Sequence, residues 1–293
     1  MSSSVNLVKI EDYNTPEHPT WCPGCGDYAI LKALKLALVE LNIQHHEAMI
    51  VSGIGCSSKI VHWIEMYGAH TIHGRALPIA QGAHIANHKM PLIVAGGDGD
   101  IYGIGAGHFF HAPRRNMNIT LLVHNNQVYG LTKGQASPTS ERGFVTKTQP
   151  FGVIEEPVNG IPHAIMNGAT FVARGTAANM KHLKELIKKA ILHKGFSYID
   201  ILQHCVTFNK VNTAKWVKQH AVYIGEDIEH DPTDKEAAIK IGSDVTDRIA
   251  LGVIYEVEQP AFHDLNPQIK EEALIEKDIE NIDISELIQR FIP

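Results

Sequence analysis

Residues 91–130 read PLIVAGGDGDIYGIGAGHFFHAPRRNMNITLLVHNNQVYG. The stretch opens with an apolar run, Pro91–Ala95, which predicts a buried strand. A second apolar run, Ile119–Val123, predicts another strand, and residues 103–115 between them can form a helix. This order predicts two parallel strands whose carboxyl ends carry Asp98 and Asn126. In an open α/β sheet, ligands bind at that edge.

The polar residues at this edge suit a divalent cation that holds a diphosphate. Mg²⁺ prefers oxygen ligands, which Asp98, the Asn126 side-chain amide and the backbone carbonyl of Val128 can supply. Gly97 and Gly99 let backbone N–H groups approach phosphate oxygens, and the following helix points its positive end at them. Either half alone fits a turn or loop that merely connects strands. Together, 28 positions apart, they resemble the GDG and NN motif of thiamine diphosphate enzymes.

Composition indicates a globular enzyme subunit. A chain of 293 residues with 44% hydrophobic content can bury the core of one large domain. A net charge of −6 argues against a nucleic-acid partner. No apolar run approaches membrane-spanning length, and the first residues lack the apolar core of a signal peptide. We therefore expect a cytoplasmic protein with no nucleic-acid partner and no membrane association.

The chain has four cysteines, each predicted to lie in a loop or at the end of a strand. Cys22 and Cys25 form a CPGC sequence. Cys56 follows a Gly-Ile-Gly turn, and Cys205 ends a later strand. A zinc site, a [4Fe–4S] cluster, a redox-active pair at the CPGC sequence and unrelated buried thiols all fit this spacing.

Strands and helices alternate along the chain. Predicted strands also cover 49–52, 71–73, 171–174 and 198–203, and predicted helices cover 57–67, 78–89 and 180–193. Asp27 is predicted to cap a helix that runs to Leu41. The alternation predicts an α/β fold with a mostly parallel sheet flanked by helices.

The domain organisation follows from changes in composition. Residues 1–20 are expected to form an irregular arm, and residues 21–209 the main domain. From residue 210 the sequence becomes polar, with a capping box at Thr233 for a short helix and an edge strand or hairpin arm at 251–257. We expect residues 210–293 to form an extension that contacts the domain or a partner subunit, since they cannot build a core of their own.

Seven motifs carry a resemblance to a known family. They are WCPGCG (21–26), GIGCSSK (53–59), HGRALPIAQG (73–82), GGDGD (96–100), HAPRRN (111–116), HNNQVYGLTKGQASPT (124–139) and QHCVTFN (203–209). This set resembles the β subunit of 2-oxoacid:ferredoxin oxidoreductases, and the 2-oxoglutarate or broad-specificity members more than the pyruvate ones. The resemblance covers residues 18–215 in register.

The resemblance implies a thiamine diphosphate-binding domain of the diphosphate type, with Mg²⁺ and one [4Fe–4S] cluster. The implied cluster ligands are Cys22, Cys25, Cys56 and Cys205, and the implied Mg²⁺ ligands are Asp98, Asn126 and the carbonyl of Val128. The expected contacts with thiamine diphosphate are Ile54, Gly55, Cys56, Ser57, His73, Gly97, Gly99, Asp100, Gly130 and Leu131. His73 is also a candidate catalytic residue.

Two lysines are candidates for contact with the substrates. Lys59 lies one helical turn after Cys56 and is a candidate catalytic residue that faces the reacting carbon or the substrate carboxylate; the alternative is a solvated lysine on a helix. Lys133 departs from the TGGQ sequence of pyruvate-type relatives, which suggests a charge for the substrate or for coenzyme A phosphates. A lysine on a surface loop also fits this position.

The implied activity is the coenzyme A-dependent oxidative decarboxylation of a 2-oxoacid, most closely 2-oxoglutarate, with electrons passed to ferredoxin. The glutamate that activates thiamine diphosphate would come from an α subunit that bears the pyrimidine-side domain, in an (αβ)₂ assembly. The chain has no CxxCxxCxxxCP run, so ferredoxin must dock from outside. The alternatives are a pyruvate-specific member, a subunit of a non-oxidative thiamine diphosphate decarboxylase with a structural zinc site, and a non-catalytic, metal-stabilised interaction protein.

Overall fold

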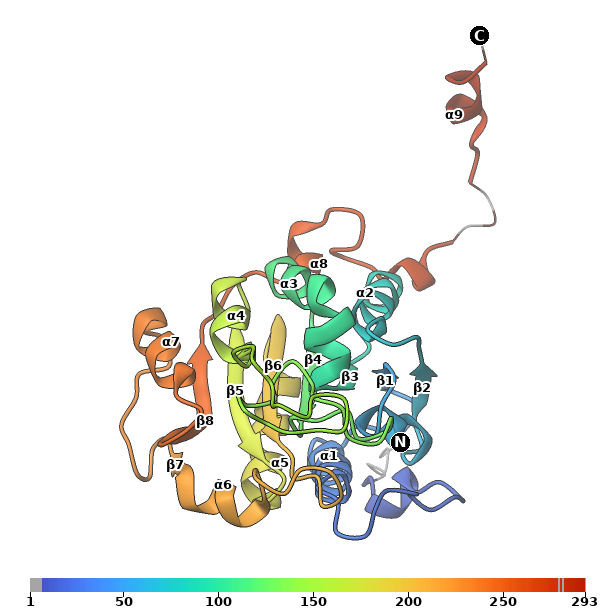
Figure 1. The fold of residues 1–293 in the computed structure, drawn as a ribbon. Coiled ribbons are helices and arrows are strands. Elements are labelled where there is room, and N and C mark those ends of the chain that lie inside the picture. Colours follow the sequence, from blue (N-terminus) through green and yellow to red (C-terminus); the bar gives the residue numbers. More distant parts are fainter. Residues whose placement is uncertain (1–6, 279, 281, 293) are drawn as a thin grey trace.

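The computed structural model describes residues 7–278, 280 and 282–292, which form a central sheet covered by helices on both faces (Figure 1). The strands are β1 (Met49–Ser52), β2 (Tyr67–His70), β3 (Leu92–Gly97), β4 (Ile119–Asn125), β5 (Phe171–Thr176), β6 (Phe196–Leu202), β7 (Ala221–Tyr223) and β8 (Ile249–Glu256). The α-helices are α1 (Asp27–Glu40), α2 (Ala76–Ala86), α3 (Ala106–Arg115), α4 (Gly160–Met166), α5 (Met180–Leu192), α6 (Ala214–His220), α7 (Lys235–Ser243), α8 (Phe262–Leu265) and α9 (Ser285–Gln289). Short 3₁₀ or π segments are η1 (Ile10–Tyr13), η2 (Ser57–His62), η3 (Gly99–Ile104) and η4 (Leu274–Glu276).

The described residues place eight strands in the order β2-β1-β3-β4-β6-β5-β8-β7. Every neighbouring pair is parallel except β5 and β8, which are antiparallel. The predicted α/β class with a mostly parallel, helix-flanked sheet is confirmed. Because β1, β3, β4 and β6 run in the same direction, the segments that follow them leave the sheet at one common edge.

The two faces of the sheet are buried in separate cores. Ile93 and Ala95 of β3 pack in the core that contains α1 and α5. Leu92 and Val94 of the same strand pack in the core that contains α2, α3 and α4. Fully burying a side chain of this size stabilises a fold by roughly 1.5–3 kcal/mol. A strand held from both faces provides a rigid support for Asp98, the residue that follows it.

The role predicted for Asp27 is wrong. Helix α1 does begin at Asp27, but its N-cap is Gly26 and no side chain caps the helix. The Asp27 carboxylate is buried, with Oδ1 2.7 Å from Nδ1 of His124 on β4. The carboxylate therefore forms a buried hydrogen bond with His124 across the fold instead of accepting hydrogen bonds from its own helix.

The strand predicted at 71–73 is also wrong. The strand at this place is β2, residues 67–70, which pairs with β1 at the edge of the sheet. Its side chains are mostly exposed, so it has no apolar run that the sequence could reveal. The N–H of Thr71 still donates to the carbonyl of Ser52 at 2.8 Å, and the chain then turns at Gly74.

Two predicted helices differ in length or regularity. The helix predicted at 57–67 is the short 3₁₀ segment η2, which ends at His62. The helix predicted at 103–115 starts later, because the chain first forms the π segment η3 and is non-helical at Gly103. The segment directly after Asp98 therefore has wider turns than an α-helix.

The C-terminal part of the chain extends the sheet. Strand β8 lies between β5 and β7, so it is not the edge strand predicted at 251–257. Helix α7 begins where the sequence predicted a short helix, but its cap is Asp234, which accepts from the N–H groups of Glu236 and Ala237. The boundary at 209/210 stays a prediction.

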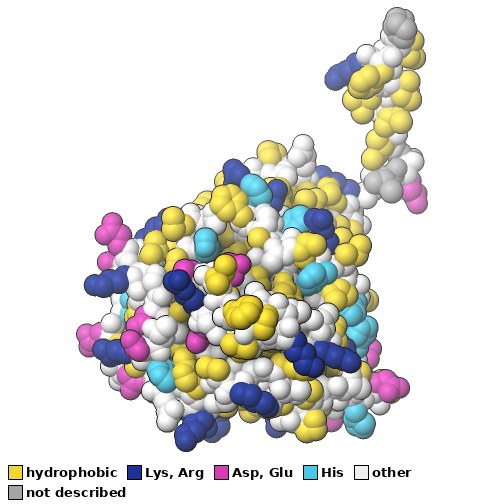
Figure 2. Space-filling view, viewed as in Figure 1, with side chains coloured by type: hydrophobic (Ala, Val, Ile, Leu, Met, Phe, Trp, Pro, Cys, Tyr) yellow, Lys and Arg dark blue, Asp and Glu magenta, His cyan; other side chains and the backbone are white. Residues whose placement is uncertain are grey.

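Helix α9 projects away from the rest of the chain (Figure 1). In Figure 2, hydrophobic side chains are gathered along this projecting segment. Ile284, Leu287 and Ile288 are each half-exposed or more. Within the described ranges, no helix has both the length and the apolar character needed to cross a membrane.

A histidine cluster joins α2 to α8. His84 is fully buried, and within the described residues neither of its ring nitrogens has a hydrogen-bond partner. The rings of His88 and His263 stack beside it, with their centroids 4.7 Å apart. Burial lowers the pKa of His84 to about 4, and the neighbouring His263 and His88 act in the same direction. The folded chain therefore takes up a proton at His84 far less readily than the unfolded chain does.

We predict that the contribution of His84 to the free energy of unfolding falls as the pH is lowered from 6.5 toward 4, the window between the ordinary pKa of histidine and that of folded His84. At His84 the unfolded chain binds more protons within this window, so the contribution lost at the acid end is about 2–3 kcal/mol. The buried carboxyl of Asp98, whose pKa is raised, acts in the opposite direction, so the contribution of His84 is measured as the difference between the unaltered chain and His84→Leu. Urea unfolding of the cofactor-free chain measures this dependence. His84→Leu should remove most of it, and His111→Leu, at an exposed histidine, should leave it. An unchanged pH slope in His84→Leu would contradict the assignment.

Candidate functional site

The candidate site forms where the four central parallel strands end. Strands β1, β3, β4 and β6 end at Ser52, Gly97, Asn125 and Leu202. The loops that follow them carry Cys56, Asp98, Asn126 and Cys205. The structure therefore brings to one edge of the sheet residues that are as far apart as 149 positions in the sequence.

Asp98 is a buried carboxylate in this edge, only 1% exposed. The hydroxyl of Thr139 donates to its Oδ2 at 2.6 Å. Burial raises the pKa of Asp98 to about 6, against the hydrogen bonds from Ser137, Thr139 and the N–H of Asn126, which lower it. In the part of the chain that the structure describes, Asp98 has no ion-pair partner. A buried negative charge without a counter-charge is unfavourable, and a divalent cation would relieve it.

The loop after β4 places the other predicted Mg²⁺ ligands next to Asp98. The Oδ1 of Asn126 accepts from the N–H of Val128 at 3.0 Å, which closes a tight turn around Gln127. Both Asn126 and Val128 are buried. The hydroxyl of Tyr129 donates to the carbonyl of Gly99 at 3.2 Å. These bonds hold the loops after β3 and β4 against each other.

Position 99 must be glycine for a steric reason that the sequence did not reveal. A Cβ atom at this position would lie 2.1 Å from Cε1 of Tyr129. At Gly97 the corresponding distance is 3.1 Å, to the hydroxyl of Ser57. Glycine is therefore required at position 99, where the loops after β3 and β4 approach each other, in addition to any role in the approach of phosphate groups.

Asp100 joins the end of β1 to the loop after β2. Its Oδ1 accepts from the N–H of Ile54 at 3.0 Å and from the N–H of Gly74 at 2.7 Å. The same oxygen lies 2.7 Å from Nδ1 of His73. One buried carboxylate thus gathers two of the segments expected to contact the cofactor. A direct contact of Asp100 with the cofactor stays a prediction.

The cysteine loops lie next to one another. The N–H of Gly26, directly after Cys25, donates to the carbonyl of His204, directly before Cys205. The side-chain amide of Gln203 donates to Sγ of Cys25 at 3.2 Å. The indole N–H of Trp21, next to Cys22, donates to the carbonyl of Cys56 at 2.7 Å.

The thiols also influence one another electrostatically. Burial raises the pKa of Cys56 to about 11, and the charges of Asp27, Cys205 and Cys22 add to the effect. Burial raises the pKa of Cys25 as well, with Asp27 and Cys205 acting in the same direction. Thiolates form in such surroundings only when a positive charge such as iron compensates them.

The described residues hold no group of three or more His, Cys, Asp or Glu side chains arranged to bind a metal ion. This finding supports neither the zinc site nor the [4Fe–4S] cluster. The predicted Mg²⁺ site has one carboxylate, one amide and one backbone carbonyl. Only one of these three groups is a His, Cys, Asp or Glu side chain, so the finding does not test this site.

The two candidate lysines occupy different surroundings. Lys59 is partly buried, and its charge lowers the pKa of Cys56 against the larger effect of burial. Lys133 is exposed, and its backbone has a φ of +78°, the left-handed conformation that favours glycine. This conformation explains why glycine suits the same position in the TGGQ sequence of pyruvate-type relatives.

Sequence reasoning missed Thr139 and the pair formed by Asp27 and His124. Thr139 lies in the quoted motif at 124–139, but no pattern assigns a hydrogen bond to a residue 41 positions away. Asp27 and His124, which are hydrogen-bonded to each other, are 97 positions apart. The sequence shows only that these residues are polar, and a polar residue type does not identify its hydrogen-bond partner.

The sheet and its polar carboxyl edge define a thiamine diphosphate-binding domain. Residues 53–201 match the family model described as "Thiamine pyrophosphate enzyme, C-terminal TPP binding domain", and residues 205–271 match the model for the C-terminal part of the pyruvate ferredoxin oxidoreductase beta subunit. The chain belongs to the β subunits of 2-oxoacid:ferredoxin oxidoreductases and is thus part of an oxidoreductase. The family predicted from the sequence motifs is confirmed.

Three relatives illustrate the similarity. The chain is 47% identical over 255 residues to 2-oxoacid:ferredoxin oxidoreductase 1, subunit beta, of Aeropyrum pernix, covering 84% of this chain and 80% of the relative. It is 34% identical over 264 residues to 2-oxoglutarate synthase subunit KorB of Methanocaldococcus jannaschii, covering 86% and 94%. A solved 2-oxoglutarate:ferredoxin oxidoreductase from Magnetococcus marinus, with 2-oxoglutarate, coenzyme A and succinyl-CoA bound, matches with a TM-score of 0.91 at 36% identity, covering 99% of this chain and 98% of that chain.

We predict that Gly53→Ala destabilises the chain, because the new Cβ would lie 1.9 Å from Oδ2 of Asp100 and displace the carboxylate that holds Ile54 and Gly74. Such overpacking lowers the free energy of unfolding by about 1–3 kcal/mol. Urea unfolding measures the change. The matched control is Gly82→Ala in α2, where nothing lies within 4 Å of the added atom. Equal stability of the two variants would show that Asp100 can move at no cost.

Proposed function

We propose that this chain is the diphosphate-binding half of an enzyme that decarboxylates a 2-oxoacid oxidatively. With coenzyme A it would form acyl-CoA and CO₂, and a pair of electrons would pass to ferredoxin. We propose 2-oxoglutarate as the substrate, which the names of two relatives support. The observation that carries the proposal is Asp98, a buried carboxylate without a cationic partner among the described residues, next to the loop of Asn126.

The Mg²⁺ site would use three groups of this chain. Asp98, the Asn126 amide oxygen and the Val128 carbonyl would hold the ion against the diphosphate of thiamine diphosphate. The tight turn at Asn126 supports this role, since the bond to the Val128 N–H leaves a second lone pair on Oδ1. Gly97 and Gly99 would lie closest to the phosphates.

The reactive side of the cofactor would face the segments that Asp100 gathers. Ile54, Gly55, Ser57, Gly130 and Leu131 would line it. When bound, thiamine diphosphate would supply the carbanion chemistry that decarboxylates the 2-oxoacid, and a [4Fe–4S] cluster would take up the electrons. His73 lies beside this carboxylate, with Nδ1 2.7 Å from Oδ1 of Asp100, and its ring would exchange a proton with the substrate.

Four thiolates, from Cys22, Cys25, Cys56 and Cys205, would hold the cluster. The contacts between their loops support this ligand set. We propose that Lys59 lies between cluster and substrate, where its ammonium group would attract the carboxylate of the 2-oxoacid.

Lys133 is our candidate for substrate selection. A lysine in the left-handed conformation is strained, and such strain is concentrated at functional sites. We propose that its ammonium group pairs with the second carboxylate of 2-oxoglutarate or with coenzyme A phosphates. The glycine of pyruvate-type relatives offers no such charge.

We propose that this chain forms only half of the active site, so it needs partner proteins. The β-subunit relatives imply an α subunit, which would supply the pyrimidine-side domain and its glutamate. The exposed apolar side chains of α9 support contact with another subunit in an (αβ)₂ assembly. Ferredoxin would dock as a separate protein.

The test of the proposed function is reconstitution. The purified chain alone should release no CO₂ from 2-oxoglutarate, because the activating glutamate is on the α subunit. Adding the α subunit should restore CO₂ release and ferredoxin reduction together. Labelled CO₂ and the ferredoxin spectrum provide the two measurements. Turnover by the chain alone would favour a non-oxidative decarboxylase, and restored CO₂ release without electron transfer would contradict the oxidoreductase reaction.

Replacing Cys205 tests the cluster separately. We expect Cys205→Ala to lose most of its iron and acid-labile sulfide, since one of four thiolates is removed. Thr207→Ala, on the same loop, is the control and should keep both. Iron and sulfide analysis of anaerobically purified protein measures the outcome. Full iron content in Cys205→Ala would reject this ligand set, and stoichiometric zinc in the unaltered chain would favour the zinc alternative.

A further inference from the structure

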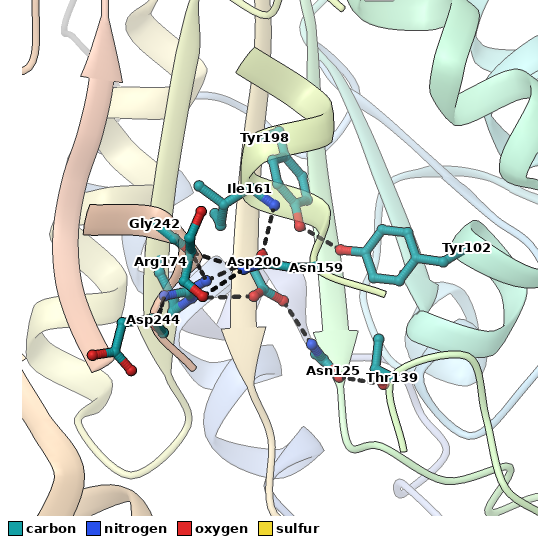
Figure 3. Close-up of polar contacts among 11 residues, drawn as sticks. Tyr102, Asn125, Thr139, Asn159, Ile161, Arg174, Tyr198, Asp200, Gly242 and Asp244 are labelled. Carbon is teal, nitrogen blue, oxygen red and sulfur yellow. Dashed lines mark hydrogen bonds and ion pairs between the residues drawn. The ribbon is translucent and has the colours of Figure 1, made fainter. Parts of the chain in front are cut away.

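A buried ion pair lies on β6, which is next to β4, and on β5, which follows β6 in the sheet. Arg174 on β5 and Asp200 on β6 are paired directly across the sheet, and Nε of Arg174 lies 3.3 Å from Oδ2 of Asp200 (Figure 3). The side chains are 0% and 4% exposed. A buried pair of charges is stable only when further hydrogen bonds satisfy both groups. The partners of each group therefore show what the pair holds in place.

Arg174 binds the C-terminal part of the chain. One of its terminal nitrogens donates to the carbonyl of Gly242 at 2.9 Å, and the other to the carbonyl of Asp244 at 3.3 Å. Both carbonyls lie at the end of α7, where helix carbonyls lack partners within the helix. The side chain of Asn159 donates to Gly242 as well. The guanidinium group thus attaches α7 to the middle of the sheet.

Asp200 continues the chain of contacts toward the site. Its Oδ1 accepts from Nδ2 of Asn125 at 3.1 Å. This bond fixes the orientation of the Asn125 amide, because a carboxylate accepts only from the NH₂ side. The amide oxygen of Asn125 therefore faces Thr139, 3.0 Å from its hydroxyl (Figure 3).

Thr139 makes the last contact. Its hydroxyl lies 2.6 Å from Oδ2 of Asp98 and 3.0 Å from Oδ1 of Asn125. A hydroxyl has one proton, so the Asn125 oxygen shares it with Asp98 in a three-centre hydrogen bond. The shorter, charge-assisted contact with Asp98 is the stronger one. The orientation of the Asn125 amide therefore influences how strongly Thr139 donates to Oδ2 of Asp98.

We propose that Thr139, Asn125, Asp200 and Arg174 form a positioning relay for Asp98. The relay fixes which carboxylate oxygen faces the Mg²⁺ ion, and it couples the cofactor site to the end of α7. Residues that orient a metal ligand change metal affinity by about 10–100-fold when replaced. The inference rests on the proposed Mg²⁺ and thiamine diphosphate site and adds positioning residues that do not touch the ion.

Replacing Thr139 tests the contact with Asp98. In the complex with the α subunit, Thr139→Val should weaken Mg²⁺ binding about 10–100-fold in excess thiamine diphosphate, since valine keeps the shape and removes the donor. Thr139→Ser keeps the hydroxyl and should restore near wild-type affinity. Titration calorimetry measures both, and the melting temperature of cofactor-free protein reports folding. Equal affinity in the valine and serine variants would overturn the relay.

The distant end of the relay is the Arg174–Asp200 pair. Replacing only one of the two residues would leave the other charge buried without a partner. Arg174→Gln combined with Asp200→Asn removes both charges at once. We expect weaker Mg²⁺ binding than in the wild type, and no further loss when Thr139→Val is added, because the two changes interrupt one chain. Losses that simply multiply would show independent sites and overturn the coupling.

The wild-type titration separates two failures. If the wild-type complex binds no thiamine diphosphate in a Mg²⁺-dependent way, the proposed function is overturned and the relay with it. If the wild type and Thr139→Val bind Mg²⁺ equally tightly, the relay alone is overturned and the proposed function stands.

Discussion

Asp98 brings a negative charge to the carboxyl end of β3, where the surrounding chain excludes water. The cost of that burial raises its pKa to about 6 even though several donors contact it. A carboxylate can be held there only by a strand that cannot shift, and β3 is packed from both faces. The loops after β1 and β4 are then bonded to this strand's end through Asp100 and Tyr129. The arrangement of the site therefore depends on the strand and loops that hold the buried carboxylate of Asp98 in place.

The cysteine loops obey the same constraint. Cys25 and Cys56 lie in surroundings that disfavour thiolates, mainly because they are buried and secondarily because Asp27 is negative. Asp27 is itself hydrogen-bonded to His124, which lies on β4 two residues before Asn126. Carboxylates and thiols at one sheet edge thus create a region with an excess of potential negative charge. Such a region favours cationic cofactors over any neutral ligand.

The sequence predicted those parts of the fold that are buried on two sides. β3 and β4 have continuous apolar runs for this reason, and their parallel direction was enough to place Asp98 beside Asn126. β2 was misplaced because an exposed edge strand carries no apolar signal. The role of Asp27 was misread because helix capping is a local pattern, whereas its partner is 97 positions away. Thr139, Asp200 and Arg174 could not be assigned for the same reason, since hydrogen bonds across a sheet have no period in the sequence.

Lys133 adds a second kind of unfavourable energy to this edge. Its left-handed backbone costs on the order of 1–2 kcal/mol for a residue with a side chain, and glycine would avoid that cost. The buried charge of Asp98, directly after β3, is electrostatically unfavourable. The backbone of Lys133, in the loop after β4, is conformationally unfavourable. A ligand that binds both groups would recover the first term through its cation and offset the second through a charge pair. Binding and folding are then linked, since any ligand that binds only the folded chain stabilises it by an amount that grows with the logarithm of the ligand concentration divided by Kd. The part of the fold that is least favourable alone is therefore the part that would gain most from the proposed cofactor and substrate.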